Sequence, residues 1–191
     1  MKEKLIELEK IYSSFSEKAK GYKAGQACQK GCAFCCAKAG SIDITTLEGL
    51  RIRKALNVLA KKQQKSFAKT LHQEMKKREK EKIVPCPFLM KSKACIIYNV
   101  RPFSCRRIYS NHICTSQKPP EVNRHVMDIA GKSIKALQQL DDTGYSGHLS
   151  YILHMLDTPA FLDTYLNGDF KPREIMVFGK SHKIIINKMM L

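Results

Sequence analysis

Apolar and polar residues alternate with a helical period at the start of the chain. Apolar side chains recur at steps of three and four residues, at Leu5, Leu8, Ile11, Tyr12 and Phe15. This spacing predicts an amphipathic helix over residues 2–20 whose apolar stripe packs against another element.

A second helical pattern begins near residue 45. Thr45 followed three residues later by Glu48 is typical of a capping box, in which the two side chains satisfy free N–H groups at a helix start. Leucines at helical spacing then predict a helix that runs, with a break, toward Lys82. Pro85 and Pro87 end it and hold the cysteine between them extended.

The last third of the chain shows three more helical patterns. They predict helices over residues 122–137, 148–157 and 160–166. Two short apolar segments, 174–178 and 184–186, either pair as a terminal hairpin or trail from the domain.

Residues 21–40 and 84–115 show no periodicity, and they contain all the cysteines. Within the second stretch, residues 94–98 are β-prone and predict a short strand. We therefore expect a mainly α protein in which residues 1–120 form a cysteine-rich region with N-terminal helices. Residues 121–191 then form a helical extension packed into the same domain.

The composition fits one ordinary globular domain, with 191 residues of which 43% are hydrophobic. No apolar run approaches the roughly 18 residues needed to cross a bilayer. Glu3, Glu7 and Glu9 interrupt the N-terminal apolar residues, unlike the continuous stretch of a secretory signal peptide. These features predict a cytoplasmic protein.

Eight cysteines are unusual in such a chain. Cytosolic thiols are kept reduced, so abundant cysteine there favours metal binding over disulfides. In an oxidising compartment the same cysteines would instead pair with one another. They fall into two groups of four: Cys28, Cys32, Cys35 and Cys36, then Cys86, Cys95, Cys105 and Cys114.

The first group has the spacing C-x-x-x-C-x-x-C-C. Thiolates this close together repel each other, so the cluster is stable only if a cation neutralises it or the sulfurs oxidise in pairs. Cys35 and Cys36 are adjacent and point apart, so one of them serves a second site or packs as a small apolar side chain. Two four-cysteine sites and one site supplied by both groups fit the spacing equally.

Basic residues surround the second group, because residues 86–114 contain five Lys and Arg and no acid. We expect Arg101 and Arg106 to hydrogen-bond the sulfurs around a metal; the alternative is that they bind phosphate or remain solvated. His112 also lies in this segment. With eight thiols available it is not needed as a ligand, and a core or surface role is more common.

Cys28, Cys32 and Cys35, with Phe34 before the last, match the C-x-x-x-C-x-aromatic-C pattern of radical S-adenosylmethionine enzymes. Those enzymes build a partial barrel of alternating strands and helices after the motif. Here long amphipathic helices and a second cysteine group follow, so the context argues against this chemistry.

Four motifs occur in a fixed order, namely the doublet ending at Cys36, then Cys86-Pro-Phe-Leu89, Cys95-Ile-Ile-Tyr98 and Arg101-Pro-Phe-Ser-Cys105-Arg106. Together they resemble the bacterial cysteine-cluster family of the YkgJ type, described as a zinc- or iron-chelating domain. The resemblance covers roughly residues 28–114 and implies metal binding by the eight cysteines and little else. It implies no reaction, since most members have none assigned. Independently of the resemblance, we expect Tyr98 to lie around the metal with Arg101 and Arg106.

The formal net charge of +17 raises the possibility of a nucleic acid or acidic protein partner. Residues 61–82 hold nine basic and three acidic side chains. Apart from Phe67 no aromatic residue alternates with them, so the stacking platform of a single-strand binder is missing. A solvated helix face is the more common interpretation.

We therefore predict a small, mainly α domain whose irregular cysteine-rich loops are held together by an iron–sulfur cluster or zinc, with at most one short hairpin. Iron–sulfur is favoured, because the adjacent cysteines and the C-x-x-x-C-x-x-C spacing suit it better than a zinc knuckle. The alternative is a cluster-dependent enzyme that modifies protein or RNA with S-adenosylmethionine. No catalytic residue is identified, and no membrane partner is expected.

Overall fold

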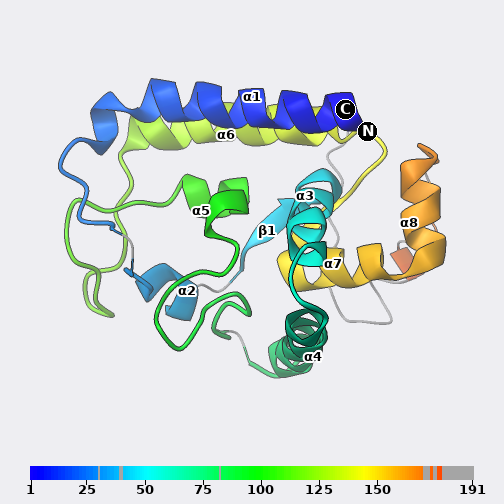
Figure 1. Ribbon diagram of the computed structural model, residues 1–191. Coiled ribbons are helices and arrows are strands. Elements are labelled where there is room, and N and C mark those ends of the chain that lie inside the picture. The colour runs from blue at the N-terminus through cyan, green and yellow to red at the C-terminus, as the bar shows by residue number, and fades with distance from the viewer. Residues whose placement is uncertain (30, 39–40, 82, 170–172, 174–175, 178–191) are drawn as a thin grey trace.

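The computed structural model describes residues 1–29, 31–38, 41–81, 83–169, 173, 176 and 177, and it is mainly helical, as expected (Figure 1). These residues form eight α-helices and one two-stranded sheet. None of the described helices is long and apolar enough to span a membrane. The hairpin expected at 174–178 and 184–186 falls almost entirely outside the described residues.

Two long helices, α1 (Lys2–Ala19) and α6 (Arg124–Leu140), lie side by side along one face of the molecule (Figure 1). Lys4 near the start of α1 forms an ion pair of 2.5 Å with Asp142, just after α6, so the two helices run antiparallel. The apolar stripe predicted for the first helix is buried between them, together with Val126, Ala130 and Leu137 of α6. The helices predicted over 2–20 and 122–137 are confirmed.

The sheet joins two segments that are distant in the sequence. Strand β1 (Asp43–Thr45) pairs antiparallel with β2 (Ser146–His148), with Ile44 opposite Gly147. Each strand leads directly into a helix, β1 into α3 (Thr46–Asn57) and β2 into α7 (Leu149–Asp157). The two helices therefore start from one shared edge and pack against each other.

The contact between α3 and α7 requires a small residue. A Cβ atom added at Gly49 in α3 would lie 2.9 Å from side-chain atoms of Ile152 and Leu156 in α7. Both partners are buried. Gly49 therefore lets the two helices approach more closely than any larger residue would.

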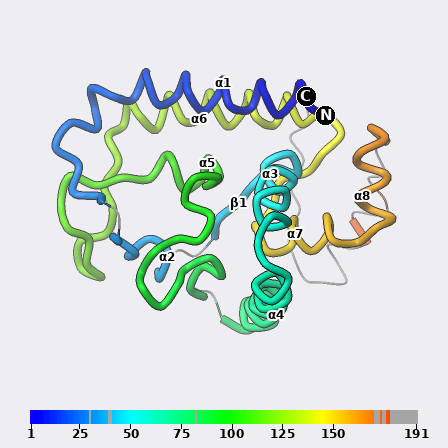
Figure 2. Tube along the Cα trace, viewed as in Figure 1, coloured from blue at the N-terminus to red at the C-terminus, as the bar shows by residue number. Residues whose placement is uncertain are grey.

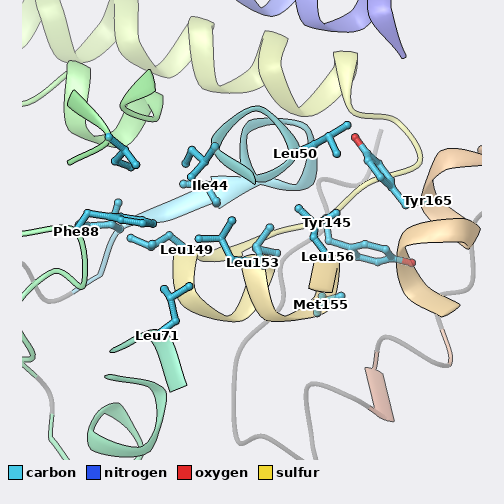
Figure 3. Close-up of a cluster of buried hydrophobic side chains, with 14 residues drawn as sticks. Ile44, Leu50, Leu71, Phe88, Tyr145, Leu149, Leu153, Met155, Leu156 and Tyr165 are labelled. Carbon is cyan, nitrogen blue, oxygen red and sulfur yellow. The ribbon is translucent and has the colours of Figure 1, made fainter. Parts of the chain in front are cut away.

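The main apolar core surrounds α7 (Figure 3). Its side chains come from α3, from α4 (Lys61–Arg78) and from α8 (Pro159–Leu166), and Phe88 joins them from the cysteine-rich loop. The ring of Phe88 stacks on Phe67 of α4, with 5.4 Å between ring centroids. This core therefore continues into the cysteine-rich region.

The expected helix and its break are present, since α3 and α4 are separated at residues 58–60, but α4 ends at Arg78 and does not continue toward Lys82. The outer face of α4 carries exposed lysines, whereas its single acid, Glu74, is buried and pairs with Arg78 at 2.5 Å. The strand predicted at 94–98 is wrong. Only Cys95 pairs there, in an isolated bridge to Leu89, because the chain turns immediately before and after it.

Candidate metal centre

Glu48 joins the helical body to one of the cysteine segments. As predicted, it forms a capping box: its Oε2 accepts the Thr45 N–H (2.9 Å), and Thr45 Oγ1 accepts the Glu48 N–H (3.2 Å). Its other oxygen, Oε1, accepts the Tyr12 hydroxyl (2.6 Å) and the Phe103 N–H (2.7 Å). Phe103 is the first residue of α5 (Phe103–Arg106), so this buried carboxylate fixes the short helix that carries Cys105.

Cys86 and Cys95 occupy equivalent places in two tight turns. The Leu89 N–H donates to the Cys86 carbonyl (3.0 Å), and the Tyr98 N–H donates to the Cys95 carbonyl (3.2 Å). The bridge between Leu89 and Cys95 holds the turns together, and Lys93 takes a left-handed backbone conformation (φ 61°) between them. The two cysteines are thus presented side by side by one small irregular hairpin.

In both turns a backbone N–H points at the cysteine sulfur. The Phe88 N–H donates toward Cys86 and the Ile97 N–H toward Cys95, and each interaction favours the thiolate and lowers the pKa of its thiol. Burial outweighs this effect and raises the pKa of Cys86 to about 12. Such N–H···S bonds are the usual support of metal-bound thiolates.

The first cysteine group reaches this hairpin through the short helix α2 (Phe34–Lys38). The Cys86 N–H donates to the Cys36 carbonyl with an N···O distance of 2.7 Å, so α2 is hydrogen-bonded to the hairpin (Figure 1). Cys35 and Cys36 both lie on this helix.

One cavity collects cysteines from three segments of the chain, and its lining includes Cys32, Cys35, Cys36, Cys86, Cys95 and Cys105. Phe88, Ile97 and Leu149 add apolar surface from the main core. Its charged lining residues are all basic: Lys93, Arg101 and Arg107. The cavity therefore combines thiols with an apolar floor and positive charge.

Four of these thiols influence the ionisation of at least one other thiol of the cavity. After burial, which is the largest cause, Cys35 and Cys95 raise the pKa of Cys105, to about 12. Cys105 and Cys95 likewise raise the pKa of Cys86. The pKa of Cys35 is raised above its usual range, first by a hydrogen bond with Cys36 and then by burial. Cys35, Cys86, Cys95 and Cys105 therefore form a mutually repelling group, which a cation would stabilise.

All eight cysteines are free thiols, and only Cys32 is exposed. Among the described residues, no three His, Cys, Asp or Glu side chains already stand close enough together to hold a metal ion. The donor set nevertheless fits zinc or an iron–sulfur cluster, because both accept four cysteine ligands. Binding would require the four sulfurs to draw together.

The residues expected around the metal lie in different places. Arg101 lines the cavity, and its charge lowers the pKa of both Cys95 and Cys105. Its guanidinium also lies 3.8 Å from the ring centroid of Tyr98, another cavity residue. Arg106 instead stacks over Tyr12 at 4.7 Å and donates to the backbone carbonyls of residues 99 and 101. Its position indicates that it holds the loop.

Cys28 and Cys114 do not line this cavity. Of the histidines, His112 lies beside Cys114, with its Nε2 3.0 Å from the Pro119 carbonyl oxygen. His148 is buried at the start of α7, where its Nδ1 accepts the Ser150 N–H (3.3 Å). Neither imidazole points to the cysteine cavity, since neither is among its lining residues.

Two features were missed by the sequence interpretation. Glu48 was identified only as a helix cap, although its second oxygen anchors the segment of Cys105. The paired turns at Cys86 and Cys95 were not foreseen either, although each cysteine is followed by three apolar residues. The partial barrel of radical S-adenosylmethionine enzymes is not formed by the described residues, whose only strands are β1 and β2.

The family model CxxCxxCC, described as "Putative zinc- or iron-chelating domain", matches residues 27–127. The match includes every cysteine, together with α3, α4 and the loops that form the cavity. No curated protein and no solved structure matches the chain.

Proposed function

The chain belongs to the CxxCxxCC family of zinc- or iron-chelating domains, and on this premise we propose that Cys35, Cys86, Cys95 and Cys105 bind a metal centre. The observation that supports the proposal is that these thiols, from three separate segments, line one cavity. Four thiolates and no other ligand type suit zinc or an iron–sulfur cluster.

The surroundings support a centre whose charge is balanced. Four thiolates keep a metal site negative, and Arg101 supplies a positive charge next to Cys95 and Cys105. The Phe88 and Ile97 N–H groups donate to two of the sulfurs. These contacts are of the kind that orient metal ligands and tune a bound centre.

We propose an iron–sulfur cluster rather than zinc as the occupant. The adjacent cysteines and the C-x-x-x-C-x-x-C spacing of the first group are more typical of iron–sulfur ligands than of a zinc knuckle. When bound, such a cluster supplies one-electron redox chemistry. The chain's own part would be to bind the cluster through its cysteines, to donate backbone N–H bonds to the Cys86 and Cys95 sulfurs, and to line the cavity with apolar side chains.

The cysteine cavity borders the main apolar core, so metal binding and folding should be coupled. Phe88 and Ile97 each adjoin a cysteine-containing turn and are buried in the core around α7. Drawing the four sulfurs together would fix both turns. Structural metal sites contribute on the order of 10 kcal/mol to folding in small domains.

The test is purification without oxygen, followed by elemental analysis and a visible spectrum, on wild type, Cys86→Ser and Cys36→Ser. We expect iron and sulfide with broad visible absorbance in the wild type, and loss of both in Cys86→Ser. Cys36→Ser is the matched control, because it removes a thiol from the same cavity but not from the proposed four. Colourless protein with zinc would contradict the iron–sulfur assignment, and metal-free folded protein would contradict metal binding altogether.

A further inference from the structure

The outer face of α4 carries exposed basic side chains and no acid. This helix lies at the opposite edge of the molecule from α1 and α6 (Figure 2). Six of its eighteen residues are exposed lysines, namely Lys61, Lys62, Lys65, Lys69, Lys76 and Lys77. We call these six residues the α4 lysine face.

The positive charge of this face is not balanced by nearby acids. Glu74, the only acid in α4, is 4% exposed, and its two oxygens accept Arg78 Nε and the Ser150 hydroxyl. None of the six lysines forms an ion pair with any residue that the structure describes. In α1, by contrast, exposed acids lie among the exposed lysines, and Lys10 pairs with Glu7 at 3.0 Å. Mixed charge of that kind is typical of a helix face that is merely solvated.

The lysines also weaken the helix that carries them. Lys61 and Lys62 lie in the first turn, where there is no acid, so their charges oppose the positive end of the helix dipole. Lys61, Lys65 and Lys69 follow one another at four-residue steps, and like charges at this spacing repel. Residues that work against their own helix indicate a role other than stability.

The surroundings of the face argue against a protein or a membrane as its partner. Protein interfaces are built around aromatic and apolar side chains and are poor in lysine, whereas α4 exposes no large apolar side chain. Helices that bind membranes insert an apolar side. The apolar side of α4, with Phe67, Leu71 and Met75, is packed into the main core and is not available for insertion.

The geometry of the face suits the backbone of a DNA duplex. Lysine binds phosphate as a point charge, and duplex DNA carries one negative charge per about 1.7 Å of its axis. The lysines extend over about 24 Å of the helix and over an arc of about 160° around it. A helix lying along the major groove, which is about 12 Å wide, presents such an arc to both phosphate backbones. Single strands fit less well, because α4 exposes no aromatic side chain on which bases could stack.

We propose that the α4 lysine face binds the phosphate backbone of double-stranded DNA without reading its sequence. The stack of Phe67 on Phe88 holds this face beside the turn that contains Cys86. The protein would therefore carry its DNA contact next to the proposed four-thiol centre. DNA binding itself does not rest on the presence or the identity of a metal.

The test is fluorescence anisotropy of a labelled DNA duplex of mixed sequence, titrated with the full-length chain at a series of KCl concentrations. If all six lysines contact phosphates, the logarithm of the binding constant should fall against the logarithm of salt concentration with a slope of about −5. In Lys62→Gln/Lys65→Gln/Lys69→Gln we expect a slope shallower by about 2.7 and binding at least about tenfold weaker at 0.1 M salt.

The matched control is Lys18→Gln/Lys132→Gln/Lys135→Gln, which removes three exposed lysines from α1 and α6 and leaves the same net charge. Its affinity should stay within about twofold of wild type, because these lysines lie away from the proposed contact. Circular dichroism and urea unfolding check the fold of both variants, and the α4 variant should be at least as stable as wild type because it loses like-charge repulsion. Should it lose its helices, Lys76→Gln/Lys77→Gln replaces it, with an expected change in slope of about 1.8.

Several results would overturn the proposal. Equal weakening in the α4 variant and the control would show that net charge alone attracts DNA. Tighter binding of wild type to duplex RNA, to phosphatidylserine vesicles or to polyglutamate than to duplex DNA would assign the face to another partner. Absence of DNA binding by folded wild type at low salt would remove the proposal and leave the metal centre unaffected.

Discussion

The helical body and the cysteine-rich region are held together by different forces. In the body, long amphipathic helices bury apolar stripes, as between α1 and α6, where Leu8 and Val126 are fully buried. In the cysteine-rich region, short turns and two one-turn helices carry partly buried thiols that repel one another as anions. We therefore expect the body to depend mainly on apolar burial, and the cysteine-rich region to depend also on the proposed metal centre.

The two regions meet at a few residues. Glu48 joins α1 and α3 to the helix of Cys105, and Phe88 joins the core around α7 to the turn of Cys86. Glu48 and Phe88 therefore position the cysteine segments, whereas residues such as Leu8 and Val126 contribute only to the body. Substitutions of each kind should have different signatures.

A Cys→Ser substitution should lower metal content and stability most where the thiol belongs to the proposed four-thiol centre. Cys105→Ser removes a ligand held by α5, and we expect it to lose the metal of the four-thiol centre together with up to about 10 kcal/mol of metal-derived stability. Cys32→Ser changes an exposed thiol and should keep that metal with little loss of stability. Elemental analysis and thermal unfolding check both variants. Equal losses in the two would show that Cys32 is also a ligand and that the four ligands are misassigned.

Glu48→Gln should weaken both regions at once. The carboxylate accepts the Tyr12 hydroxyl and the Thr45 and Phe103 N–H groups, and an amide in its place would direct its own N–H₂ at one of these donors. We expect a loss of about 3 kcal/mol in urea unfolding and weaker metal retention. The exposed Glu17→Gln in α1 is the matched control and should change neither. Unchanged metal retention in Glu48→Gln would show that α5 is positioned by other contacts.

The body should also show a pH dependence that the cysteine-rich region does not cause. Asp141 is buried after α6, and burial raises its pKa from 3.8 to about 6, although the Leu47 N–H and the Tyr165 hydroxyl donate to it and lower its pKa. Its folded-state pKa is the higher one, so ionisation costs stability as pH rises from about 4 to 6, by about 3 kcal/mol.

Urea unfolding at several pH values, on wild type and Asp141→Asn, isolates this contribution. Across that window, the free energy of unfolding of wild type should decrease relative to that of Asp141→Asn as pH rises. A difference that stays constant from pH 4 to 7 would contradict the assignment.

Gly49→Val should destabilise the body with the smallest of these effects. A Cβ there would lie 2.9 Å from Ile152 and Leu156, so α3 and α7 would have to separate or repack. We expect a loss of about 2 kcal/mol in chemical unfolding. Gly131→Val in α6 is the control, because a Cβ at that position meets no atom within 4 Å. Equal destabilisation of the two variants would show that the close contact at Gly49 is not the cause of the loss.

The elements that were predictable from the sequence are those whose stability is local. The periodic stripe of α1, the Thr45 capping box and the Pro159 start of α8 each follow from residues within a few positions of one another. The pairing of β1 with β2 was not predictable, because each strand is three residues long and its partner lies a hundred residues away. The strand expected at 94–98 failed because turn hydrogen bonds around Cys95 replace a ladder.

For the candidate site, the sequence predicts cysteine ligands but not which of them share a cavity. The eight cysteines and Arg101 were expected from spacing and charge. The separation within the first group, in which Cys35 lines the cavity and Cys28 packs against the α1–α6 core, depends on tertiary contacts such as the Ala27 to Ser110 hydrogen bond. Such contacts produce no periodic pattern in the amino-acid sequence from which they could be predicted.

X-ray absorption at the metal edge of protein purified without oxygen tests the central claim most directly. The account predicts bound metal surrounded by sulfur, at about 2.3 Å for either zinc or iron, with an additional metal–metal distance if the centre is an iron–sulfur cluster. In Cys105→Ser the metal of the four-thiol centre should be lost, or one of its sulfur neighbours should be replaced by a lighter atom. Metal surrounded mainly by oxygen and nitrogen, or unchanged sulfur coordination in that variant, would contradict the account.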